Sequence, residues 1–200
     1  LTEMEEKEMK ITLKDGSFKE YDQAMAAIDI AKDISEGLAR VACVAEVDGN
    51  VVDLRTIIDK DCTLNILTFD SEEGKKAYRH TCAHVLAQAV KNLYPDAKLT
   101  IGPAIDNGYY YDFDMESLDR AALDAIEKEM KKIIKKGDKL ERFELSKEEA
   151  IELMTKRDEP YKVEMIKEHP DTDTLTFYQQ GDFIEFCAGP HLMSTKTIKA

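Results

Sequence analysis

Two short motifs, separated by about a hundred residues, constrain this chain more than any other feature. The first is His80-Thr81-Cys82-Ala83-His84, and the second is Cys187-Ala188-Gly189-Pro190-His191. Together they contain three of the four histidines in the chain. A fold that brings the two motifs together would gather several imidazole and thiol groups at one place.

The first motif lies in a predicted helix, residues 73–93, which is rich in helix formers and ends before Pro95. At about 100° per residue, His80 and His84 lie within about 40° of each other on this helix. Its apolar residues fall on roughly the opposite side, so we expect the histidines to face water, a groove or a partner. A lone helical histidine is commonly solvated. Two at this spacing can instead approach one point, as they do in helical zinc motifs.

The second motif has a different backbone, because Gly189 and Pro190 predict a turn between Cys187 and His191. The residues before it, 183–186, are predicted to end a strand. A thiol and an imidazole at the end of a strand, beside a helix with two more imidazoles, are typical of a site built on rigid elements.

Several segments, in this order and spacing, resemble the editing domain of bacterial threonyl-tRNA synthetases. The resemblance covers about residues 70–195. It rests on His80-x-x-x-His84, on Leu99-Thr100-Ile101-Gly102-Pro103, on Gly108-Tyr109-Tyr110-Tyr111-Asp112-Phe113, and on Cys187 to His191. It implies an α+β domain over residues 70–200, with a mainly antiparallel sheet and a long helix that carries the His-x-x-x-His pair.

Residues 1–69 are predicted to form a smaller domain. The first seven residues are acidic, and we expect them to be frayed. Alternating apolar residues and an Asp15-Gly16 turn then predict a small ubiquitin-like β-grasp sheet around one helix. This order resembles the TGS domain that precedes the editing domain, and we interpret it as a packing or adaptor module without chemistry. We expect strands at 9–13, 17–21, 41–47, 51–54 and 62–68, a helix at 24–31 that Asp22 can cap, and a short helix at 56–58.

The rest of the second domain is predicted from local signals. Ser117 can cap a helix that Gly137 ends, Ser146 begins a capping box, and Pro160 opens a further helix. A hairpin turns at Gln180-Gly181. The strands that we expect cover residues 98–101, 109–113, 140–145, 174–178 and 183–186.

The resemblance implies hydrolysis of serine esterified to the 3' end of the threonine tRNA. We assign His80 as the base or the water holder, His84 and His191 as groups that position substrate or water, and Cys187 as a lining residue. Lys162 and Tyr111 are expected to hold the substrate and to help exclude threonine. The sequence by itself does not choose between Tyr110 and Tyr111. Glu185 matches an acidic position of the family, where the relatives carry Asp.

Zinc is the rival chemistry, because His80, His84, Cys187 and His191 make a legitimate tetrahedral ligand set. Related alanyl editing domains hold zinc with this constellation, whereas threonyl-type domains are expected to work without it. Four protein ligands would also leave no open position for a catalytic water. We therefore expect that no cofactor is required.

The net charge of −13 argues against strong RNA binding by the chain alone, because such binding depends on Lys and Arg neutralising phosphates. The densest basic cluster, Lys131, Lys132, Lys135 and Lys136, is interpreted as a solvated helix face. The catalytic and anticodon-binding domains of a parent synthetase, expected to be a homodimer, would then hold the tRNA. The four cysteines indicate a reducing cytoplasm, and no apolar run is long enough for a membrane span.

Two alternatives remain at this level. The chain could be a freestanding aminoacyl-tRNA deacylase, or a non-catalytic RNA- or protein-binding module whose four groups hold a structural metal. Class II aminoacylation signatures are absent from the sequence, so we do not expect it to make threonyl-adenylate. The missing initial Met and the abrupt end at Ala200 favour a fragment of a full synthetase.

Overall fold

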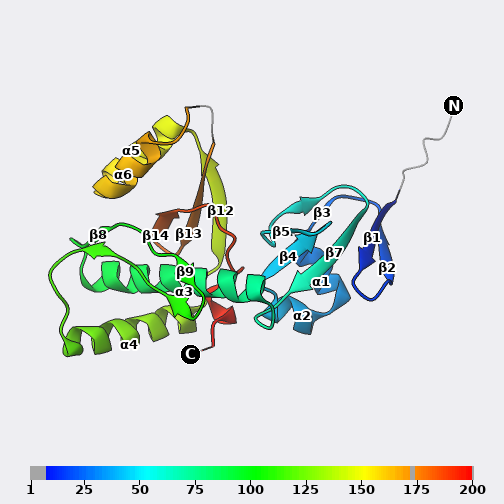
Figure 1. Cartoon of the computed structure of the whole chain (residues 1–200), viewed down its shortest axis with the longest axis horizontal. Coiled ribbons are helices and arrows are strands. Elements are labelled where there is room, and N and C mark those ends of the chain that lie inside the picture. Colours follow the sequence, from blue (N-terminus) through cyan, green and yellow to red (C-terminus); the bar gives the residue numbers. More distant parts are fainter. Residues whose placement is uncertain (1–7, 172–173, 200) are drawn as a thin grey trace. The chain divides into compact units, whose positions relative to one another are not determined.

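A computed structural model of the chain describes residues 8–171 and 174–199 (Figure 1). The acidic start, for which we expect fraying, lies outside the described residues. The chain divides into two compact units: residues 1–77 with 190–192, and residues 78–189 with 193–200. The expected domain boundary between residues 69 and 70 stays a prediction.

The first unit is built on a five-stranded mixed sheet in the order β2-β1-β7-β4-β5. Strands β1 and β7 pair in parallel, and the other neighbours pair antiparallel. Helix α1 (Ala27–Ile34) buries Ile28 and Ile30. The β-grasp prediction is confirmed. The strands are β1 (Met9–Leu13), β2 (Phe18–Tyr21), β4 (Val44–Val47), β5 (Asn50–Val52) and β7 (Cys62–Leu67).

Three local predictions for this unit were wrong. The short helix expected at 56–58 is instead strand β6 (Ile57–Ile58), which pairs antiparallel with β3 (Met25–Ala26). Helix α1 follows Ala26 rather than a cap at Asp22. A further helix, α2 (Glu36–Val41), occupies part of the predicted strand 41–47, and the Ser35 side chain accepts a hydrogen bond from Leu38 N at its start.

The second unit contains most of the long helix α3 (Glu72–Leu93), drawn in green in Figure 1. Strand β8 (Lys98–Leu99) pairs with β11 (Phe113–Asp114), and β9 (Ala104–Ile105) forms a hairpin with β10 (Gly108–Tyr109). The predicted strand 109–113 is therefore broken between Tyr109 and Phe113. The backbone of this bend is still held, because Asp112 N donates to Ile101 O at 2.8 Å.

A three-stranded antiparallel sheet, β12-β13-β14, forms the other part of this unit. Ile166 of α6 packs with Met154 of α5 and Phe177 of β13 in a buried core. Figure 1 shows α5 and α6 lying together in yellow and orange. The bounds are β12 (Leu140–Leu145), α5 (Lys147–Lys156), α6 (Pro160–Lys167), β13 (Leu175–Gln180) and β14 (Phe183–Phe186).

Local signals placed several helix ends correctly. The Ser146 hydroxyl accepts from Glu149 N, and Pro160 opens α6. Helix α4 (Arg120–Lys136) ends at Gly137, which has φ 71° and adopts the left-handed conformation that favours glycine. Its cap is the Asp119 side chain rather than Ser117. The 3-10 helix η1 (Thr195–Thr197) follows near the end of the described chain.

Helix α3 is buried on more sides than its sequence predicts. Ala87, which lies on the same side of the helix as His80 and His84, is fully buried against Leu99 and Phe183. His84 is only 2% exposed, whereas His80 remains partly exposed. The side of α3 that carries the histidines therefore faces a groove.

Among the described residues, we find no helix that is long and apolar enough to cross a membrane.

Candidate functional site

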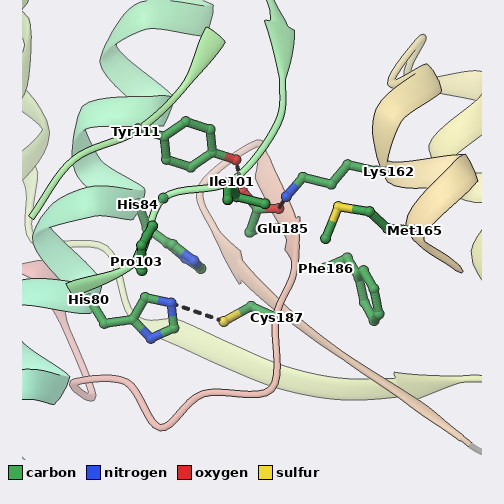
Figure 2. Close-up of a pocket in the computed structure, with 11 residues that line it drawn as sticks. His80, His84, Ile101, Pro103, Tyr111, Lys162, Met165, Glu185, Phe186 and Cys187 are labelled. Atoms are coloured by element: carbon green, nitrogen blue, oxygen red, sulfur yellow. Dashed lines mark hydrogen bonds and ion pairs between the residues drawn. The ribbon is translucent and has the colours of Figure 1, made fainter. Parts of the chain in front are cut away.

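A pocket of about 320 Å³ lies within the second unit, where four segments converge. Helix α3 contributes His80 and His84, and the bend before β9 contributes Ile101 to Pro103. Lys162 comes from α6, and the segment 185–187 closes the pocket from the end of β14. Figure 2 shows these side chains pointing toward one another from opposite walls.

One end of the pocket holds two imidazole rings and a thiol. The ring centroids of His80 and His84 lie 5.2 Å apart in a T-shaped arrangement. His80 Nε2 lies 3.3 Å from Cys187 Sγ, and Gly189 N donates to the same sulfur at 3.3 Å. The turn after β14 thus brings Cys187 to the histidine helix, which is the arrangement that the expected site requires (Figure 2).

The other end holds a buried polar network centred on Glu185. Lys162 Nζ lies 2.6 Å from Glu185 Oε1, and Tyr111 OH donates to Glu185 Oε2 at 2.5 Å. Lys162 and Glu185 are 3% and 2% exposed, so this ion pair is almost fully desolvated. The Lys162 ammonium also lies 5.8 Å from the Tyr111 ring centroid, within reach of a cation–π interaction.

Burial changes the acidity of these groups. It raises the pKa of Glu185, and the nearby Lys162 charge opposes that rise. Burial likewise raises the pKa of the Tyr111 phenol, with the Glu185 charge adding to the effect. Burial holds the pKa of His84 well below its usual value, and His80 and Lys162 lower it further. The pocket therefore contains a neutral imidazole at neutral pH.

Cys187 carries a thiol rather than a thiolate near neutral pH. Burial raises its pKa to about 12, although the Gly189 N–H opposes this shift. A thiol is a donor and a weak nucleophile, because nucleophilic attack needs the thiolate. In contact with His80, Cys187 can donate a hydrogen bond and line the pocket.

Of the two candidate tyrosines, the bend places Tyr111 in the pocket. Tyr111 lines the pocket and stacks on Phe113 with ring centroids 4.7 Å apart. Tyr110 is 42% exposed and is not among the lining residues. Strand alternation alone could not separate them, because both lie in the bend between β10 and β11.

Two apolar lining residues, Met165 and Phe186, were not singled out from the sequence. Met165 lies three residues after Lys162 on α6, so the helical period was a usable signal for it. Phe186 lies between Glu185 and Cys187, and strand alternation would have pointed it to the other side of the sheet. In Figure 2 Met165 lies beside Lys162 and Phe186 lies below Met165, both on the side of the view away from the histidines.

His191, the last member of the second motif, is fully buried. The ligand atoms of His80, His84, Cys187 and His191 all lie within 4.8 Å of one another. Three imidazoles and one thiol match the donors and the number that tetrahedral zinc prefers. The residues therefore fit a zinc ion, which would act as a Lewis acid or as a structural ion if bound.

Comparisons with known families assign both parts of the chain. The TGS domain family matches residues 9–68. The threonyl and alanyl tRNA synthetase second additional domain matches residues 175–200, which include the Cys187 turn. The chain is therefore of the class that joins a TGS domain to this additional domain.

Curated relatives narrow this class. Over 193 residues, 96% of the chain, it is 59% identical to the threonine–tRNA ligase of Acetivibrio thermocellus and 55% identical to that of Clostridioides difficile. It is 55% identical over 195 residues to that of Caldanaerobacter subterraneus subsp. tengcongensis. By sequence, the chain is a relative of the threonine–tRNA ligases, which confirms the resemblance. It spans about 30% of the length of these relatives.

Proposed function

We propose that the second unit proofreads the charging of the threonine tRNA, by hydrolysing the ester between a wrongly attached serine and the tRNA 3' end. The observation that carries this proposal is the pairing, in one pocket, of a histidine–thiol end with a buried Lys162–Glu185 ion pair. The first end can hold and activate a water. The second can bind the polar part of a small amino acid, and its Tyr111 hydroxyl fixes the carboxylate.

Selection of serine follows from what such a network can discriminate. The aminoacylation site of a synthetase gains only about 1–3 kcal/mol of discrimination from one methylene, which is too little to keep serine from being attached in place of threonine. A second site that hydrogen-bonds the seryl hydroxyl and leaves no room for a methyl can supply the missing selectivity. In this proposal Lys162 and Glu185 hydrogen-bond the seryl hydroxyl, and Tyr111 completes the wall of the pocket beside them.

The proposed reaction is attack of water on the ester carbonyl. His80 takes a proton from the water, and a tetrahedral intermediate forms. The intermediate collapses with cleavage of the bond to the ribose oxygen, and the proton passes to that oxygen as free serine leaves. His84 and His191 position the water or substrate. Cys187 lines the pocket as a thiol.

We propose that this hydrolysis needs no metal. With all four groups bound to zinc, the ion would have no open position for water, whereas catalytic zinc sites keep one. Zinc remains the alternative, because the four ligand atoms fit it. Metal analysis of protein purified without chelator, compared with activity after dialysis against a chelator, separates the two.

The partners are proposals of the same kind. We propose that the chain acts as part of a cytoplasmic, homodimeric threonine–tRNA ligase, whose other domains hold the tRNA and perform aminoacylation. A freestanding deacylase or a non-catalytic binding module held together by metal is the alternative. Seryl-tRNA hydrolysis by the chain would exclude the non-catalytic module.

The test is deacylation of seryl-tRNA by the 200-residue chain. For His80→Ala we expect a loss of about 10²-fold or more, the usual contribution of a general base. Lys162→Ala should also lose activity, because its ammonium is expected to hold the seryl hydroxyl. Lys128→Ala, on the exposed side of α4, is the matched control and should retain full activity. Unchanged rates for both His80→Ala and Lys162→Ala would refute these roles.

A further inference from the structure

A carboxylate outside the pocket, Glu159, joins three elements of the second unit. It lies just before α6 and is only 3% exposed. Its Oε1 lies 2.8 Å from Lys91 Nζ, on the last turn of α3, and its Oε2 accepts a hydrogen bond from Leu99 N of β8 at 2.9 Å. A single side chain thus connects the histidine helix, strand β8 and the start of α6.

Lys91, the partner of Glu159 on α3, is itself held by several acceptors. Besides its ion pair with Glu159, Lys91 Nζ donates to Pro95 O at 2.9 Å and to Ala97 O at 2.8 Å. Three acceptors around one ammonium leave it little rotational freedom. The bridge to Glu159 therefore starts from a fixed point.

Stability alone is a weak reason for such a bridge. Taking two charges out of water is costly, and well-packed apolar side chains in their place are often as stabilising or more so. A buried ion pair differs from an apolar contact in its direction, because charge and hydrogen-bond geometry fix where the partners lie. The bridge is thus better suited to orienting α6 than to adding stability.

Helix α6 is attached to the second unit near both of its ends. Toward its end, Ile166 packs into the core formed with α5 and the three-stranded sheet. At its start, the side chain of Glu159 makes the bridge, and Glu159 O accepts from Val163 N within the first turn. Lys162 lies in that first turn and reaches Glu185 in the pocket. If the start of α6 were released, the backbone that carries the Lys162 side chain would no longer be held in place.

We propose that Glu159 is a positioning residue, whose bridge from Lys91 and Leu99 sets the place of Lys162 in the pocket. Its importance for hydrolysis rests on the proposed function. Its effect on the placement of Lys162 does not, and it can be measured without any tRNA.

The test uses acetylation of lysines by a limiting amount of acetic anhydride, with each site quantified by mass spectrometry. In the native chain Lys162 is buried and paired, so it should react slowly compared with the exposed Lys128. In Glu159→Gln, which removes the charge but keeps the size, Lys162 acetylation should rise by about tenfold as the start of α6 opens locally.

Glu152→Gln is the matched control. Glu152 lies on the exposed side of α5, in an ion pair with Lys156, so the same charge change there should leave Lys162 acetylation at the wild-type rate. Thermal unfolding of each variant shows that the measurement is made on folded protein. If Glu159→Gln does not fold, Lys91→Gln tests the same bridge from its other end and should give the same rise.

Unchanged Lys162 acetylation in the folded bridge variants would overturn the proposal, because a bridge that contributes only stability would lower the melting temperature and leave Lys162 protected. The seryl-tRNA assay tests the reaction separately. Increased acetylation in a chain that hydrolyses no seryl-tRNA would sustain the positioning role and reject the proposed reaction.

Discussion

At the scale of single residues, the pocket depends on the carboxylate of Glu185. It accepts from Tyr111 and pairs with Lys162, and both members of this ion pair are almost fully buried. Each donor is therefore worth more than it would be at the surface, because a buried charge that loses a partner keeps its full desolvation cost. The network is expected to respond strongly to the loss of one hydroxyl.

Tyr111→Phe removes that hydroxyl and keeps the ring that stacks on Phe113. A hydrogen bond to a charged group contributes about 1.5–3 kcal/mol, so we expect seryl-tRNA deacylation to fall by about 10- to 100-fold. Tyr110→Phe is the control, because Tyr110 is 42% exposed and does not line the pocket. Equal effects of the two changes would show that Tyr111 has no special place in the site.

Cys187 gives a prediction about pH. Its pKa is raised to about 12, so lowering the pH below that value keeps the thiol protonated. Because only the thiolate reacts, its alkylation by iodoacetamide should be slow at pH 7 and should rise about tenfold for each pH unit up to pH 10. Labelling followed by mass spectrometry measures this. Fast labelling that does not change with pH between 6 and 8 would instead mark a thiolate paired with His80.

The same residue scale shows what sequence reasoning can and cannot reach. The two motifs and the family resemblance suggested that His80 and Cys187 belong to one site, and His80 Nε2 lies 3.3 Å from Cys187 Sγ. Glu159 gave no such signal. A glutamate is almost never buried without a partner, so its burial could be predicted only if its partner were known. That partner, Lys91, lies 68 residues earlier in the chain. Local pattern can identify a cluster of unusual residues, but it cannot identify a common one whose role depends on a distant contact.

At the scale of elements, the bend before the β9–β10 hairpin packs directly on Tyr111. A Cβ atom added at Gly102 would overlap the Tyr111 ring. The ring has little freedom to move, because it is stacked on Phe113 and bonded to Glu185. The absence of a side chain at Gly102 thus sets how closely this wall approaches the network.

Gly102→Ala should therefore displace Tyr111 and open the polar end of the pocket. Overpacking of this kind costs about 1–3 kcal/mol, which urea unfolding of the chain can detect. Seryl-tRNA deacylation should fall as well. In the hairpin that follows the bend, a Cβ at Gly108 would meet no atom within 4 Å, so Gly108→Ala serves as the control. Equal stability losses in both variants would point to backbone flexibility as the cause.

Several helix ends that carry local signals were predicted correctly, whereas two elements that depend on distant pairing were not. Ser146, Gly137 and Pro160 each marked a helix end that the structure has. Ile57 and Ile58 carry no such signal and become a strand only because Met25 and Ala26 pair with them. The bend between Tyr109 and Phe113 likewise depends on backbone bonds to the segment that begins at Ile101.

At the scale of the whole molecule, charge limits what the chain can do alone. Its net charge is −13, so we expect the chain as a whole to repel a polyanion such as tRNA. The basic cluster on α4 offers little relief. Lys131 pairs with Glu127 at 3.1 Å, and Lys136 lies 3.4 Å from Asp138. The interpretation of this cluster as a solvated helix face agrees with these contacts.

We therefore expect the 200-residue chain to bind uncharged tRNA weakly, with a Kd of about 10⁻⁵ M or above at physiological salt, the range of non-specific binding. Raising salt from 50 to 200 mM should weaken binding further, because the remaining attraction comes from phosphate contacts that release counterions. Filter binding at the two salt concentrations measures both. Replacing Lys131, Lys132, Lys135 and Lys136 by Gln is the control and should change the Kd little. A nanomolar affinity that does not depend on salt would contradict the prediction, and it would mean that the chain recognises tRNA without the rest of a synthetase.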